Sequence, residues 1–393
     1  AGPKALLNDS RMPITPTDFG ISNLKIIDIP NVEGFVQITA SAVLFEEHHG
    51  RPWTTELIIF APRYDRLSAT NAVAVVGQSG TKHMVGEAGE PDPTWDEYPN
   101  FFTDHSGLTL KENYGRIALD FGIPVIFGNA VPKAIELPVD VQEQTQAYID
   151  SLDVCVSQNC IGELTTDGDI TDCLFLATML TQDPFYEHHF NYGLAQSRMM
   201  DAGEYLLQEF YHQSAGGDFE IEQAWSIGNS KRGAAQQGFL ALDDRLKGAI
   251  VGASDASNLR AYIDTMLSSW DGGYSYGAPV IDDLLRGETL EAHSAIYETG
   301  RWTTEVLEGK TLVFAVGTND PHFPILNAHG YLAAVPGARQ LVVPNYQHGM
   351  GTVDHLSGFR ALIDEGLNQV AWPNVTAQWD VTEGVVRARV ESG

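Results

Sequence analysis

The chain has 393 residues, 52 of them Asp or Glu and 23 Lys or Arg, so its formal net charge is −29. This acidity argues against nucleic acid as a partner and disfavours anionic membranes. Hydrophobic residues make up 43% of the chain, more than a disordered chain of this charge would contain, so we expect one or two folded domains.

The first predicted elements are strands. Residues 35–47 and 53–61 are rich in β-branched and aromatic side chains, and 71–77 is a short apolar run that ends in a Gly-rich loop. A helical pattern at 110–121 leads into another short buried strand at 122–128.

Helices and strands then alternate. A long helical stretch at roughly 172–212 is followed by strands at 221–228, 248–252, 311–317 and 339–344, with helices near 231–242 and 355–369. This alternation predicts an α/β fold, a mainly parallel sheet with helices on both faces. The last two apolar runs, 375–381 and 384–390, predict a β-hairpin.

A Gly-x-Ser sequence lies where the strand at 221–228 meets the following helix. This context is typical of a nucleophile elbow, and the N-terminus of the helix offers backbone N–H groups to an oxyanion. The stretch reads Gly228-Asn-Ser230-Lys-Arg-Gly233, so an Arg stands where the common Gly-x-Ser-x-Gly pattern has Gly.

A serine nucleophile needs a base, and the base needs an acid that orients it. In this kind of sheet the acid and the His follow the Ser, in that order, on loops after later strands. Asp320 and His348 each follow one of the last two predicted strands of the sheet. We therefore predict a catalytic triad of Ser230, Asp320 and His348, with Asp255 and Asp354 as alternative acids.

The backbone N–H groups of Lys231 and Gln78 are candidate oxyanion donors, although the Gly-rich turn at Gln78 could simply close a strand. An insertion at about 255–305 is rich in aromatic residues and predicts either a cap over the site or a packing layer. The candidate substrate-binding residues are Trp270, Tyr276, Trp302 and His322.

The three cysteines are Cys155, Cys160 and Cys173. Cys155 and Cys160 flank a short polar turn, so a local disulfide between them is expected in an oxidising compartment, although the pairing among the three stays open. A zinc site would need a fourth ligand, and His188 and His189 lie too far along the chain for standard spacing. The acidic run 167–172 lacks the order of a calcium loop and is interpreted as a turn. We therefore expect neither a metal nor an organic cofactor.

No stretch approaches the roughly 20 apolar residues of a membrane span. The chain begins at Ala1 without an initiator Met, which fits a mature exported form, secreted or periplasmic.

Four stretches carry a family resemblance. They are Gly228-Asn-Ser230-Lys-Arg-Gly233, Phe121-Gly-Ile-Pro-Val-Ile-Phe-Gly-Asn-Ala-Val-Pro132, Gly317-Thr-Asn-Asp320 and Val343-Pro-Asn345-Tyr-Gln-His348. They resemble the PhoPQ-activated pathogenicity-related proteins, a branch of the α/β-hydrolases, and the elbow is also locally similar to that of glucuronoyl esterases. The resemblance implies an exported α/β-hydrolase-like domain with a β-rich C-terminal extension. From the predicted elements we expect an N-terminal arm at 1–34, an α/β-hydrolase domain at 35–372 with the inserted cap, and a C-terminal β-hairpin extension at 373–393. The resemblance also implies the triad of Ser230, Asp320 and His348.

The sequence thus predicts a secreted serine hydrolase that cleaves a small or polymeric carboxylic ester through an acyl-enzyme. Three alternatives stay open: a peptidase or amidase with the same triad, a lyase or transferase with the same nucleophile, and a non-catalytic secreted binding or signalling protein on a hydrolase fold. The acyl and alcohol parts of the substrate, the oligomeric state and the salt optimum stay open as well.

Overall fold

A computed structural model describes most of the chain. The described residues are 11, 16, 18–29, 32–78, 110–152, 159–254, 262, 264, 265, 268, 307–323, 332, 337–348, 353–372, 374–380 and 385–391.

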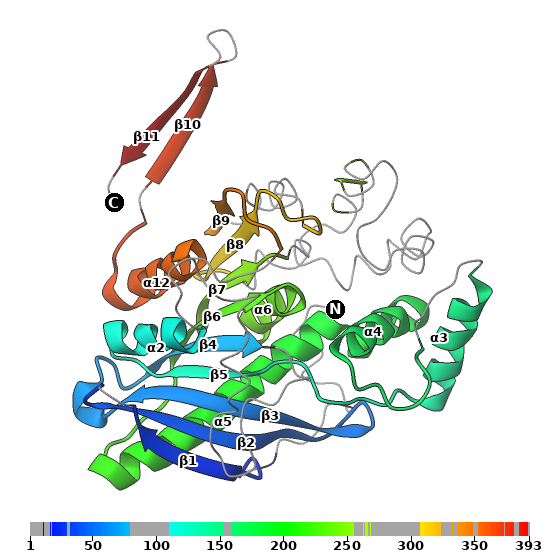
Figure 1. The fold of residues 1–393 in the computed structure, drawn as a ribbon, viewed down its shortest axis with the longest axis horizontal. Coiled ribbons are helices and arrows are strands. Elements are labelled where there is room, and N and C mark those ends of the chain that lie inside the picture. The colour runs from blue at the N-terminus through cyan, green and yellow to red at the C-terminus, as the bar shows by residue number, and fades with distance from the viewer. Residues whose placement is uncertain are drawn as a thin grey trace.

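A nine-stranded sheet forms the centre of the described structure, in the order β1-β2-β3-β5-β4-β6-β7-β8-β9 (Figure 1). Its strands are β1 (Ser22–Asp28), β2 (Phe35–His48), β3 (Arg51–Pro62), β4 (Ala72–Gln78), β5 (Val125–Asn129), β6 (Gln223–Asn229), β7 (Leu246–Gly252), β8 (Thr311–Gly317) and β9 (Ala338–Val343). From β5 through β4 to β9 every neighbouring pair is parallel, whereas β1, β2, β3 and β5 pair antiparallel in turn.

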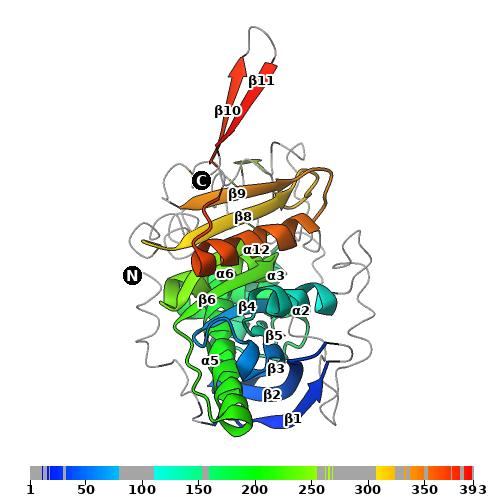
Figure 2. The same ribbon diagram turned by 90° about the vertical axis from the view of Figure 1, so that its left-hand side faces the viewer.

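Helices cover both faces of the sheet (Figure 2). One face packs against α2 (Leu110–Phe121) and α12 (Val353–Asn368), and the other against α5 (His188–Ala215) and α6 (Lys231–Leu242). Because successive strand residues point to opposite faces, the two layers bury alternate side chains of the same strands. The arrangement is the α/β-hydrolase fold that the sequence predicts.

The helical stretch predicted at roughly 172–212 is helical for most of its length but is not one continuous helix. The chain instead forms α4 (Asp167–Thr181), a 3-10 turn η4 (Pro184–Tyr186) and then α5. Proline lacks a backbone N–H and disfavours helical conformation in the residue before it, so Pro184 separates the two helices.

Four further features differ from the sequence predictions. Helix α3 (Val139–Ser151) and the edge strand β1 were not predicted. A second 3-10 turn, η2 (Tyr64–Arg66), follows β3. The acidic run at 167–172 is the start of α4 rather than a turn, because Thr166 caps the helix by accepting the Asp169 N–H at 3.1 Å.

The expected disulfide between Cys155 and Cys160 is wrong. Cys160 pairs with Cys173, which lies in α4, across a Cα–Cα distance of 5.6 Å. Both residues of the bond are fully buried, and it ties the segment before α4 to the helix itself. Cys155 lies outside the described residues.

The C-terminal segment forms a separate sheet of two antiparallel strands, β10 (Asn374–Asp380) and β11 (Val385–Glu391), as the sequence predicts (Figure 2). Near the other terminus, β1 lies within the predicted arm at 1–34 and forms the edge strand of the main sheet by pairing with β2. The domain boundaries themselves stay predictions.

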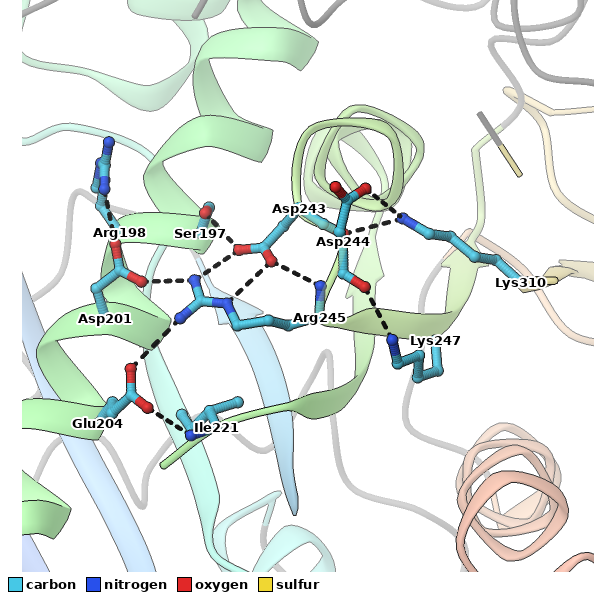
Figure 3. A network of polar contacts seen from close by, with 10 residues as sticks. All are labelled: Ser197, Arg198, Asp201, Glu204, Ile221, Asp243, Asp244, Arg245, Lys247 and Lys310. Carbon is cyan, nitrogen blue, oxygen red and sulfur yellow. Dashed lines mark hydrogen bonds and ion pairs between the residues drawn. The ribbon is translucent and has the colours of Figure 1, made fainter. Parts of the chain in front are cut away.

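A network of ion pairs lies at the start of β7 and centres on Arg245 (Figure 3). The Arg245 guanidinium donates to Asp243 at 2.7 Å and to Asp201 of α5 at 2.5 Å. Asp243 also accepts the Ser197 hydroxyl at 2.6 Å. Burial acts to raise the pKa of Asp243, but Arg245 outweighs it and holds that pKa below its ordinary value. The network therefore joins α5 to the connection between α6 and β7.

Candidate functional site

Ser230 lies between β6 and α6 in a strained conformation. Its φ of 55° and ψ of −126° belong to neither strand nor helix, and its side chain does not cap the helix. The Ser230 N–H donates to the carbonyl oxygen of Gly252 at 2.8 Å, which attaches the turn to the end of β7. A sharp strand-to-helix turn of this kind exposes the serine hydroxyl at the carboxyl edge of the sheet.

Two glycines allow this turn to form. A Cβ on Gly228 would lie 2.4 Å from the carbonyl oxygen of Arg232, and a Cβ on Gly233 would lie 2.3 Å from that of Gly252. Both contacts are with backbone, which cannot move aside easily. The close approach of α6 to β7 thus requires glycine at 233, whereas position 232 accepts an arginine.

Asp320 and His348 lie on two loops that touch each other beyond β8 and β9. The Asn319 N–H donates to the Tyr346 carbonyl oxygen at 3.0 Å. A Cβ on Gly317 would lie 2.1 Å from that same oxygen. The backbone contact between the loops sets where Asp320 lies relative to His348.

The structure brings the three predicted residues together. The Ser230 Oγ is 2.9 Å from His348 Nε2, and His348 Nδ1 is 3.1 Å from Asp320 Oδ2. The fully buried Asp320 side chain also accepts the backbone N–H groups of His322 and Phe323 at 2.8 and 3.1 Å. Because a carboxylate accepts at Nδ1, the proton lies there, and Nε2 accepts from the Ser230 hydroxyl.

Aromatic rings hold His348 on two sides. The His322 ring meets it edge-on at a centroid distance of 4.7 Å, and Phe323 stacks against it at 5.9 Å. Burial and the neighbouring His348 lower the pKa of His322. Tyr262 in turn stacks on Phe323 at 5.4 Å. The sequence predicted His322 near the substrate and Tyr262 within the aromatic insertion, but it did not predict Phe323, although Phe323 follows Asp320 by only three positions.

The two oxyanion candidates lie on neighbouring elements. Lys231 is the first residue of α6, and Gln78 is the last residue of β4. Strands β4 and β6 are adjacent and parallel, with Val76 paired to Ile227. This pairing ends two residues before Gln78 and three residues before Ser230.

Other predicted residues lie beyond what the structure describes. Trp270, Tyr276, Trp302 and the alternative acid Asp255 are outside the described residues, as is the side chain of Asp354. Among the described side chains, Asp320 is the acid that contacts His348.

One described cluster has the donor atoms of a metal site, although the sequence predicted none. Glu187, His188 and His189 each offer one ligand atom, and these atoms lie within 4.8 Å of one another. All three residues are buried, and burial raises the pKa of Glu187 to about 8.

A sequence model of the PhoPQ-activated pathogenicity-related proteins matches residues 169–393. No curated protein sequence matches the chain.

Solved structures show similarity over most of the chain. Acetyl xylan esterase 1 from Thermoanaerobacterium sp. JW/SL YS485 is 12% identical with a TM-score of 0.45, and 88% of each chain is covered. A glucuronoyl esterase from Solibacter usitatus is 10% identical with a TM-score of 0.46, over 89% of this chain and 86% of that one. A puromycin-hydrolyzing peptidase from Mycobacterium tuberculosis is 13% identical with a TM-score of 0.45, over 87% of this chain and 40% of that one.

Proposed function

We propose that this chain, which belongs to the family of PhoPQ-activated pathogenicity-related proteins, is a serine hydrolase that cleaves a carboxylic ester. The observation that carries the proposal is the 2.9 Å contact between the Ser230 hydroxyl and His348 Nε2. An alkyl hydroxyl is a poor nucleophile alone, and an imidazole at this distance is placed to accept its proton.

The proposed reaction has two steps. Ser230 Oγ attacks the acyl carbon while His348 Nε2 takes the hydroxyl proton, and the same proton passes to the leaving alcohol as the ester C–O bond breaks. Water then attacks the acyl-enzyme and loses a proton to His348, which returns that proton to Ser230 as the acid product leaves. Asp320 orients the imidazole and stabilises its cationic form throughout.

Backbone N–H groups would stabilise the tetrahedral oxyanion. The Lys231 N–H lies at the start of α6, where the helix dipole favours negative charge, and the Gln78 N–H lies on the adjacent strand. An ester is favoured as the substrate by the local similarity of the Ser230-Lys-Arg-Gly233 elbow to that of glucuronoyl esterases. An amide would use the same residues, so ester and amide substrates are both tested.

The proposed site of action is outside the cytoplasm, secreted or periplasmic. The buried Cys160–Cys173 disulfide supports this, because such bonds persist mainly in oxidising compartments. Within the described part of the chain, no helix has both the length and the apolar character needed to cross a bilayer.

Active-site labelling with a fluorophosphonate probe tests the proposal. We expect one label per wild-type chain, located at Ser230 by peptide mapping, and no label in Ser230→Ala or His348→Ala. Ser214→Ala is the matched control, because Ser214 is exposed near the end of α5. A folded wild-type protein that takes no label, or a label that persists in Ser230→Ala, would contradict the proposal.

The preference for an ester over an amide is tested on p-nitrophenyl esters and the p-nitroanilides with the same acyl groups. We expect turnover of the esters and a loss of about 10⁴-fold in kcat for Asp320→Asn, because the amide stabilises the wrong imidazole tautomer. Faster turnover of the anilides would show an amidase.

A further inference from the structure

A buried cluster of Glu187, His188 and His189 lies at the first turn of α5, apart from the Ser230 site. The exposed fractions of these side chains are 1%, 6% and 9%. Glu187 Oε2 accepts the backbone N–H of His189 at 3.0 Å, which fixes the carboxylate at the helix N-terminus. Its other oxygen, Oε1, therefore points toward the two imidazole rings.

Both rings present the same nitrogen to that oxygen. Glu187 Oε1 is 3.4 Å from His188 Nδ1 and 3.3 Å from His189 Nδ1. The ring centroids are only 3.8 Å apart. Neighbouring residues of a helix point about 100° apart, so the convergence of two consecutive imidazoles on one atom is a specific feature of this turn.

The distances fit coordination better than hydrogen bonding. Hydrogen bonds from nitrogen to a carboxylate oxygen are about 2.7–2.9 Å long when one partner is charged. Two ligands bound to one Zn²⁺ at about 2.0–2.1 Å, at the tetrahedral angle, lie about 3.3–3.4 Å from each other. The two observed separations, 3.4 and 3.3 Å, match this ligand-to-ligand distance.

One oxygen of the Glu187 carboxylate has no hydrogen-bond donor in the described structure, whereas the other accepts the His189 N–H. Glu187 Oε1 is buried and accepts no hydrogen bond from any residue that the structure describes. A buried carboxylate is costly unless a cation or hydrogen-bond donors face it. A metal ion between Glu187 Oε1 and the two imidazole nitrogens would supply that positive charge.

We propose that Glu187 Oε1, His188 Nδ1 and His189 Nδ1 bind a divalent first-row transition ion, with Zn²⁺ as the ion to test. Two imidazoles and one carboxylate form a donor set that suits Zn²⁺, and water completes the fourth position.

The ion would have a structural role and would take no part in the hydrolysis of the ester. A Cβ on Gly238 of α6 would lie 2.8 Å from the His189 carbonyl oxygen, so the first turn of α5 packs directly on the helix that begins after Ser230. An ion that fixes this turn would stabilise the packing of α5 on α6.

Metal binding is measured on the untagged full chain by calorimetric titration with ZnCl₂ after treatment with a chelator. We expect one Zn²⁺ per wild-type chain and at least about 10-fold weaker binding in His188→Gln and in His189→Gln. His212→Gln is the matched control, because His212 is an exposed histidine in the last turn of the same helix and its loss should leave the affinity unchanged.

A second measurement uses only the wild-type protein, in case a variant fails to fold. Co²⁺ added to the metal-free chain should give intense visible absorption typical of tetrahedral coordination, and one equivalent of Zn²⁺ should abolish it. No saturable Zn²⁺ or Co²⁺ binding to the wild-type chain would overturn the proposal, as would equal affinity in all three histidine variants. Fluorophosphonate labelling tests only the hydrolase proposal, so its failure would not affect the metal proposal.

Discussion

Gly317 and Tyr346 meet where the loop that carries Asp320 passes the loop that carries His348. A Cβ at Gly317 would lie 2.1 Å from the Tyr346 carbonyl oxygen, closer than any real Cβ contact. The absence of a side chain at Gly317 thus permits the backbone contact that aligns the acid with the imidazole.

Gly317→Ala should therefore reduce activity. The added methyl group must separate the two loops, and a displacement of about 1 Å between catalytic groups costs up to about 100-fold in rate. We expect kcat on an activated ester to fall about 10- to 100-fold, with a parallel fall in the fluorophosphonate labelling rate. Gly168→Ala is the control, because a Cβ there meets no atom within 4 Å and Gly168 lies in α4. A wild-type rate in folded Gly317→Ala would show that this contact does not set the geometry.

Arg245→Met should destabilise the fold without affecting catalysis. The substitution leaves the buried carboxylate of Asp243 without its charged donor, and we expect the free energy of unfolding in urea to fall by about 2 kcal/mol. Turnover should persist, because Arg245 precedes β7 whereas the Ser230 turn lies at the other end of that strand. Arg63→Met removes an exposed ion pair with Asp28 and should cost at most about 1 kcal/mol. An equal loss of unfolding free energy in Arg245→Met and Arg63→Met would contradict the expectation that the Arg245 network stabilises the fold.

His48 should make stability depend on pH. Its Nε2 donates to Asn191 Oδ1 at 2.7 Å, since the Asn191 amide nitrogen already donates to the Phe185 carbonyl oxygen. Burial lowers the pKa of His48 from 6.5 to about 4, a depression that the hydrogen bond to Asn191 partly offsets. Between these values the unfolded chain binds a proton that the folded chain does not. The stabilising effect is therefore complete above pH 6.5 and is lost as the pH falls toward 4, by about 3 kcal/mol.

The measurement is urea unfolding at several pH values between 7 and 4 for the wild type and for His48→Gln. The difference in stability between the two proteins should shrink as the pH falls. Parallel curves would show that His48 titrates alike in the folded and unfolded chains, and His212→Gln serves as the exposed control.

Loss of the disulfide should lower stability by about 3 kcal/mol, the cost expected for a closed loop of this length. Cys160 and Cys173 are 13 positions apart. The double variant Cys160→Ser/Cys173→Ser is compared in urea with the wild type, with and without reductant. Reductant should bring the wild type close to the double variant and leave the variant unchanged. A wild type whose unfolding midpoint ignores reductant would contradict this expectation.

The parallel half of the sheet could be predicted from the sequence because the signals for its strands are local. The strands β7 and β8 carry the short apolar runs 249–251 and 312–316, and such runs occur where a sheet is covered on both faces. The break between α4 and α5 also has a local signal in Pro184, which lies within the helical stretch predicted at roughly 172–212. In contrast, β1 is largely exposed, so no hydrophobic alternation marked it as a strand.

The sequence by itself predicted that Ser230, Asp320 and His348 would lie together, because each follows the end of a strand and the carboxyl ends of parallel strands meet at one edge of the sheet. Their 2.9 and 3.1 Å contacts were decided by the tertiary structure, through the approach of Gly233 to Gly252 and of Gly317 to Tyr346.

The partner of Cys160 and the convergence of Glu187 with two histidines were also decided only in three dimensions. Spacing along the chain favoured Cys155 as the disulfide partner of Cys160, and it predicted no metal ligand. Side-chain direction depends on the helix in which a residue lies and on the packing around it, and neither is encoded in spacing along the chain.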